Sequence, residues 1–167
     1  MDDRSVGSII LGIDPGLNIS GYGVVEITAR GPRLVEAGII RGGRSTSIEV
    51  RLKEIHDGVF EVLEAFRPSA LALEQLYSHY ERPRTAILMG HARGVICLAA
   101  ARVDVPIVHY AATQVKRLLT GNGRAPKSQM QQAICRELGL GQAPEPPDVA
   151  DALAIALCHH LLCRKVA

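Results

Sequence analysis

The chain has 167 residues, of which 47% are hydrophobic, so residues 1–167 are expected to form one domain with a substantial core. No apolar run approaches the ~18 residues that cross a membrane, and the N-terminus lacks the features of a secretory signal. These observations exclude a membrane partner and predict a soluble cytoplasmic protein. The formal net charge of +2 permits a nucleic-acid partner without requiring one.

The first part of the chain predicts three strands and a long helix. Strands are expected at residues 9–14, 21–28 and 33–41. The break at residues 29–32 suits a hairpin turn, so these strands should be antiparallel neighbours. Apolar residues then recur at helical spacing over residues 48–66.

The second part of the chain alternates strands with helices. Strands are expected at residues 69–74 and 105–110, and helices at residues 83–102, 112–120, 127–138 and 147–162. Three strands, a helix and then this alternation predict an α/β fold, in which helices cover a mixed sheet.

Acidic residues end two of the buried-looking strands. Asp14 is the last residue of the first strand and Glu74 the last residue of the fourth. Ligands of open α/β sheets bind beyond the carboxyl ends of strands, which favours a shared site. An exposed strand end explains Glu74 equally well. The last helix is apolar except for Asp148 and Asp151, which share one face. Helix-dipole chemistry at a first turn explains Asp148 well and Asp151 poorly.

Four converging carboxylates in a basic protein would repel one another unless a cation joins them. Oxygen ligands of this kind suit a hard divalent cation, above all Mg²⁺. Two such ions could clamp the attacking and leaving oxygens of a phosphodiester. Basic residues also cluster within residues 41–53, 82–93 and 116–127. These clusters are either solvated surface charge or phosphate-facing surfaces.

Five segments together resemble the RuvC family of Holliday-junction resolvases. They are ILGIDPGLNISGYGVV, LALEQLY, ARGV, AATQVKRLLTGNGRAPKSQMQ and DVADALAIALCH, in order from Ile9 to His159. The resemblance implies an RNase H-like fold, with a five-stranded mixed sheet flanked by helices on both sides, in a homodimer. It implies a Mg²⁺-dependent endonuclease that resolves four-way DNA junctions by paired symmetric nicks during recombination and repair. Two Mg²⁺ ions per site are expected, with Mn²⁺ as a substitute, and RuvA and RuvB as partners.

The resemblance also implies roles for individual residues. The metal-binding catalytic acids would be Asp14, Glu74, Asp148 and Asp151, and the DNA-binding residues Lys116, Lys127, Tyr77, Arg84 and Arg93. Tyr77 would stack on an unpaired base near the crossover, although a packing role is the alternative.

One segment departs from the family pattern. After Tyr77 the chain reads SHYERPR, which is about one residue longer than usual and contains Pro83. The sequence preference at the cut site could therefore differ. His79 in this segment is either a catalytic base or, by a better-supported interpretation, a phosphate or solvent contact.

Three alternatives stay open from sequence. An RNase H-like nuclease could act on RNA or damaged duplex instead. An actin-like nucleotide-binding protein also has an early phosphate loop, but it needs a longer chain and leaves Asp148 and Asp151 unexplained. A catalytically silent junction binder would not need all four acids.

Overall fold

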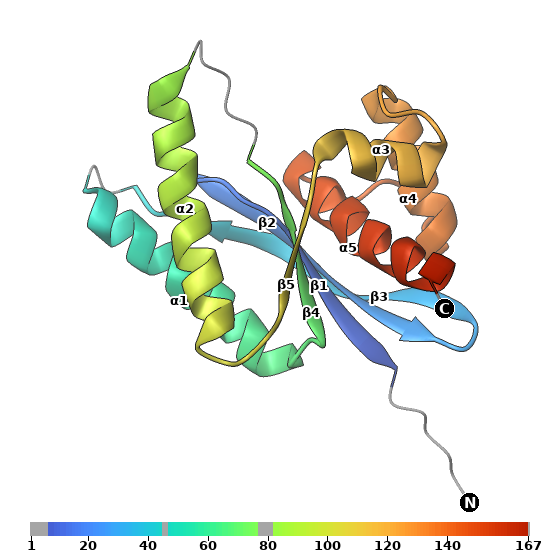
Figure 1. The fold of residues 1–167 in the computed structure, drawn as a ribbon, viewed down its shortest axis with the longest axis horizontal. Coiled ribbons are helices and arrows are strands. Elements are labelled where there is room, and N and C mark those ends of the chain that lie inside the picture. The colour runs from blue at the N-terminus through green and yellow to red at the C-terminus, as the bar shows by residue number, and fades with distance from the viewer. Residues whose placement is uncertain (1–6, 45–46, 77–81, 167) are drawn as a thin grey trace, which may run out of the picture.

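The computed structural model describes residues 7–44, 47–76 and 82–166 and contains a five-stranded mixed sheet with helices on both faces (Figure 1). The strand order is β3-β2-β1-β4-β5, with β1, β2 and β3 antiparallel and with β4 parallel to both β1 and β5. The strands are β1 (Ser8–Asp14), β2 (Ile19–Thr28), β3 (Gly31–Arg41), β4 (Ala70–Glu74) and β5 (Ile107–Tyr110). The helices are α1 (Ile48–Phe66), α2 (Pro83–Ala101), α3 (Ala112–Thr120), α4 (Lys127–Leu138) and α5 (Pro147–Val166).

The predicted elements are present, and four of their ends differ by two residues or more. Strands β2 and β3 each begin two residues earlier than expected. Strand β5 begins at Ile107, two residues later than expected. The preceding Pro106 has no N–H to donate to a sheet, but its carbonyl still accepts a hydrogen bond from the Leu71 N–H at 2.9 Å. Helix α5 continues to Val166, beyond the expected end near residue 162. Among the residues described, no helix is long and apolar enough to span a membrane.

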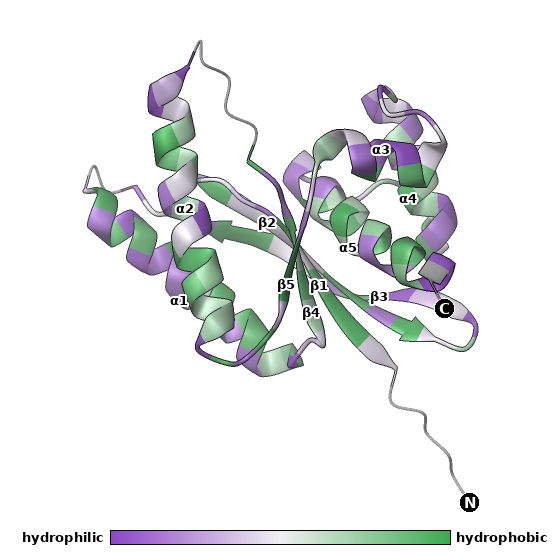
Figure 2. Cartoon of the chain, in the orientation of Figure 1, coloured by the Kyte–Doolittle hydropathy of each residue, from purple (hydrophilic) through white to green (hydrophobic). Residues whose placement is uncertain are grey.

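The two faces of the sheet carry separate cores. Leu11 and Ile13 of β1 belong to the core under α1 and α2, whereas Ile10 belongs to the core under α3, α4 and α5. Figure 2 shows the hydrophobic residues of α5 and of the strands gathered in the interior. Because side chains alternate along a strand, Asp14 projects on the face of Ile10, toward α5. The same alternation places Glu74 with Ala72 on that face.

Helix α5 lies close to the sheet because the strand residues beneath it include glycines, which have no side chain. A Cβ atom at Gly12 would fall 2.1 Å from the Ala152 carbonyl oxygen, and one at Gly21 only 2.0 Å from the Asp148 carbonyl oxygen. Gly21 is also the cross-strand partner of Asp14. These two glycines therefore leave room for the backbone of α5.

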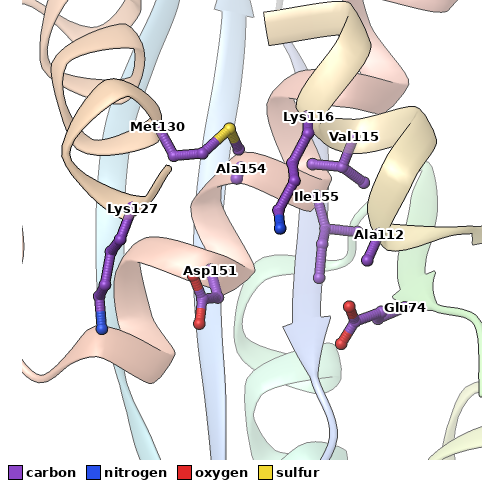
Figure 3. Close-up of a pocket in the computed structure, with 9 residues that line it drawn as sticks. All are labelled: Glu74, Ala112, Val115, Lys116, Lys127, Met130, Asp151, Ala154 and Ile155. Atoms are coloured by element: carbon purple, nitrogen blue, oxygen red, sulfur yellow. The ribbon is translucent and has the colours of Figure 1, made fainter. Parts of the chain in front are cut away.

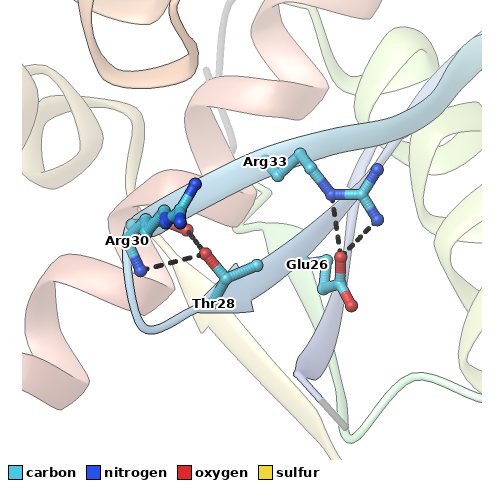
Figure 4. A network of polar contacts seen from close by, with 5 residues as sticks. Glu26, Thr28, Arg30 and Arg33 are labelled. Carbon is cyan, nitrogen blue, oxygen red and sulfur yellow. Dashed lines mark hydrogen bonds and ion pairs between the residues drawn. The ribbon is translucent and has the colours of Figure 1, made fainter. Parts of the chain in front are cut away.

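Polar contacts fix the β2–β3 hairpin, at the end of β2 remote from Gly21 (Figure 4). The Thr28 hydroxyl accepts a hydrogen bond from the Arg30 N–H at 3.2 Å and donates one to the Gly31 carbonyl at 2.8 Å. Arg33 Nε donates to Glu26 across the two strands at 2.9 Å. The turn therefore occupies residues 29–30, inside the predicted break.

Candidate active site

Asp14 and Glu74 form a carboxyl pair at one edge of the sheet. The parallel strands β1 and β4 pair Ile13 with Leu73, so the next residue on each strand emerges at the same level. Burial first, and then the charge of Glu74 and a hydrogen bond with Glu74, contribute to raising the pKa of Asp14 to about 8. A hydrogen bond between two carboxyl groups requires one proton. Without a cation, the pair therefore holds one proton near neutral pH.

Helix α5 adds two further carboxylates to this edge. Its first turn carries Asp148, and Asp151 follows one turn later. Both residues act electrostatically on Asp14 and raise its pKa. Burial raises the pKa of Asp151, Lys127 opposes this shift, Asp148 adds to it, and Lys116 opposes it. Asp14 thus interacts electrostatically with each of the other three acids predicted from sequence, although the four come from three separate elements.

A pocket of about 300 Å³ opens beside these acids (Figure 3). Its walls include Glu74 of β4, Asp151 of α5, Lys116 of α3 and Lys127 of α4. In Figure 3 the two lysines and the two acids line the same opening. Opposite charges therefore surround a space in which a phosphate and its counter-cations could lie.

The donor set fits a hard divalent cation, since all of its members are carboxylates. Burial and the neighbouring carboxyl groups raise the pKa of Asp14, so the protein does not favour the charged form of this side chain. However, within residues 7–44, 47–76 and 82–166 no three His, Cys, Asp or Glu side chains lie close enough together to form a ready ligand group. The structure provides a tight pair and two nearby acids. That all four share an ion stays a prediction.

Ser20 fixes the turn that follows Asp14, a role that sequence reasoning missed. This side chain is fully buried. Its hydroxyl accepts a hydrogen bond from the Gly16 N–H at 3.0 Å and donates one to the Gly16 carbonyl at 2.9 Å. The bonds close the turn between β1 and β2, which begins directly after Asp14. A serine four residues after a glycine is the only signal in the sequence.

The other predicted DNA-binding residues occupy different places. Arg93 lies half-buried on α2 and borders a second pocket, which also includes Glu74. Arg84 is exposed in the first turn of α2 and lines neither pocket. Tyr77 and His79 lie outside the described residues.

The fold and this acidic edge define a phosphodiester-cleaving nuclease of the metal-dependent, RNase H-like class. The family model for crossover junction endodeoxyribonuclease RuvC matches residues 10–159. A protein of that name from Rhodopirellula baltica is 60% identical over 160 residues, which cover 95% of this chain and 89% of that protein. The chain belongs to the RuvC family, and its enzyme class is crossover junction endodeoxyribonuclease.

Solved structures agree with this family. The Thermus thermophilus RuvC structure superposes with a TM-score of 0.87 at 36% identity, covering 95% of this chain and 96% of that one. Thermus thermophilus RuvC in complex with a Holliday junction substrate gives a TM-score of 0.89 at the same 36% identity and the same coverage of 95% and 96%. The expected RNase H-like fold is thereby confirmed.

Proposed function

We propose that this chain resolves four-way DNA junctions by a Mg²⁺-dependent hydrolysis that nicks two strands symmetrically. The observation that carries the proposal is the Asp14–Glu74 pair, whose shared charge only a proton or a cation can offset. Support also comes from the relative that was solved with a Holliday junction substrate.

The four acids would hold two Mg²⁺ ions, with Mn²⁺ as a substitute. When bound, these ions supply activation of the attacking water and stabilisation of the departing 3′-oxygen. Asp14 and Glu74 would bind from the sheet, and Asp148 and Asp151 from α5. Before this, Asp14 must release the proton that it shares with Glu74, so metal affinity should rise with pH.

The two lysines would bind the scissile phosphate. Lys116 and Lys127 reach the same pocket from α3 and α4. Each is a compact point charge, suited to a non-bridging oxygen whose negative charge grows in the transition state. The lysines also hold the scissile phosphate against the acids, which alone would repel it.

A homodimer would place two such sites on one junction. The exposed face of α2 supports this assembly: Ile87 and Leu98 are 63% and 54% exposed. Between them, Gly90 and Gly94 have open space where a Cβ would lie, so a second helix could approach closely. A second copy of this helix would occupy that space. A two-fold dimer would match a two-fold substrate. RuvA and RuvB remain the proposed branch-migration partners.

Incubation with a synthetic four-way junction and Mg²⁺ tests this proposal. Mapped nicks should fall at symmetric positions in two strands of like polarity. Duplex DNA and an RNA–DNA hybrid of the same sequence should remain intact. Preferential cleavage of either control would reject junction resolution and favour another RNase H-like activity.

A further inference from the structure

The C-terminal half of α5 carries two cysteines and two histidines that the nuclease site does not use. They belong to the segment CHHLLC, residues 158–163. Cys158 is fully buried in the core beneath α5, and His160 is almost fully buried as well. His159 is partly buried, whereas Cys163 is exposed. Of these four side chains, His159 and Cys163 are therefore the two that a dissolved ion can reach.

His159 and Cys163 lie four residues apart, so their side chains meet on one face of the helix. The distance from His159 Nε2 to Cys163 Sγ is 3.7 Å. A tetrahedral Zn²⁺ ion, with bonds of ~2.0 Å to nitrogen and ~2.3 Å to sulfur, holds those two ligand atoms ~3.5 Å apart. The nitrogen and the sulfur thus already stand at about the separation that a shared ion requires.

Tyr110 of β5 holds the imidazole of His159 from the other side. Its hydroxyl lies 2.7 Å from His159 Nδ1, and the two ring centroids are 5.9 Å apart in an edge-to-face arrangement. A tyrosine hydroxyl can accept a hydrogen bond from Nδ1–H, and the lone pair of the imidazole is then on Nε2, beside the sulfur. Histidines that bind metals commonly have such a partner on the second ring nitrogen, which fixes the orientation of the ring.

We propose that His159 and Cys163 bind a divalent transition-metal cation such as Zn²⁺, and that Tyr110 is a positioning residue for the histidine. A thiolate and an imidazole select such an ion, whereas carboxylates alone suit Mg²⁺. In the part of the chain that the structure describes, no group of three His, Cys, Asp or Glu side chains is placed to hold a metal ion. Water would therefore complete the coordination, and binding should be weaker than at a structural zinc site with four protein ligands.

A bound ion would fasten the C-terminal turns of α5. Its two ligands are one helical turn apart, and the contact between Tyr110 and His159 joins that turn to β5. The negative end of the helix dipole attracts a cation there, whereas Arg164 and Lys165 in the last turn repel one. Binding must therefore depend on the two ligand atoms themselves, and removal of either should abolish or strongly weaken it.

Titration of Co²⁺, a spectroscopic probe for a zinc site, into the reduced full-length protein tests this proposal. A large excess of Mg²⁺ is present, because Mg²⁺ occupies the carboxylates of the active site and competes poorly for a thiolate. A cobalt–thiolate bond gives a charge-transfer band in the near ultraviolet, which carboxylate ligands do not give. We expect this band in the wild-type protein, and Zn²⁺ should displace the Co²⁺ and remove it.

Single variants assign the ligands. Cys163→Ser should abolish the band, and His159→Gln should weaken Co²⁺ binding at least tenfold. Tyr110→Phe should weaken it about tenfold while the band at saturation stays the same; a purely structural role of Tyr110 would change the thermal stability but not the affinity. Cys135→Ser, which alters a cysteine on another helix, should behave as wild type. Absence of the band in the wild-type protein, or its persistence in Cys163→Ser, would overturn the proposal.

Thermal unfolding provides a second measurement that needs no nuclease activity. With the same excess of Mg²⁺, added Zn²⁺ should raise the unfolding midpoint of the wild-type protein by a few degrees, because an ion that binds only the folded state stabilises it. The midpoint of Cys163→Ser should not move. An equal rise in both proteins would place the ion elsewhere and would contradict the assignment.

Discussion

Replacement of Asp14 by asparagine should stabilise the protein in the absence of divalent metal. In the folded state the pKa of Asp14 is raised from 3.8 to about 8, so near neutral pH folding must take up a proton that the unfolded chain has released. At pH 7 this costs about 4 kcal/mol, at 1.36 kcal/mol for each pH unit above 3.8. Asparagine carries no charge and retains a donor toward Glu74.

The effect has a defined dependence on pH. An acid with a raised folded-state pKa loses stability as pH rises above its unfolded value, and the loss levels off above about 8. In chelator, Asp14→Asn should unfold up to about 10 °C higher than wild type at pH 7. The difference should shrink toward pH 4. Thermal unfolding followed by circular dichroism from pH 4 to pH 9 measures both.

A matched control should give the opposite sign. The pKa of Asp57 is lowered, first by its hydrogen bond from Lys53 and then by that from His56. Asp57→Asn should therefore leave the protein slightly less stable at pH 7. If Asp14→Asn is no more stable than wild type at pH 7, or gains equally at every pH, the shared-proton account of the Asp14–Glu74 pair is wrong.

Three further substitutions and one control test the site and the residues that support it. Gly21→Ala would push a methyl group into the Asp148 carbonyl. The variant should nick junctions at least tenfold more slowly and should lose about 1–3 kcal/mol of folding stability. Gly141→Ala, which has open space around it, should have neither effect. Ser20→Ala leaves the Gly16 backbone groups without their partner and should cost about 1–3 kcal/mol in urea denaturation; an unchanged midpoint would contradict this. Lys116→Ala should slow single-turnover nicking by about a hundredfold while junction affinity changes far less, and an equal loss in both would make Lys116 only a binding residue.

Most of the sheet was predictable because its signals are local. Alternating apolar residues and turn residues identify β1, β2 and β3. The position of Asp14 at the end of a strand follows from its immediate neighbours in the sequence. The pairing of β1 with β4, however, depends on contacts between residues far apart in sequence. Resemblance to the RuvC family supplied that relation, and the strand ends then placed Glu74 beside Asp14.

The supporting features were not predictable, because they depend on distances across the fold. Gly12 and Gly21 make room for the α5 backbone, which no pattern local to either glycine indicates. Ser20 reads as an ordinary strand residue, yet its hydroxyl closes a buried turn. The hydrogen bond between Arg93 and His109 likewise joins two separate elements, α2 and β5. Local sequence patterns do not predict contacts of this kind between separate elements.

The central claim is that acids from β1, β4 and α5 share divalent cations. Calorimetric titration of Mn²⁺ into the wild-type protein and into single Asn or Gln variants of the four acids measures this without activity. We expect substitution of any one of Asp14, Glu74, Asp148 or Asp151 to weaken binding at least tenfold. Wild-type affinity in the Asp148 and Asp151 variants would contradict the claim, because α5 would then take no part in holding the metal.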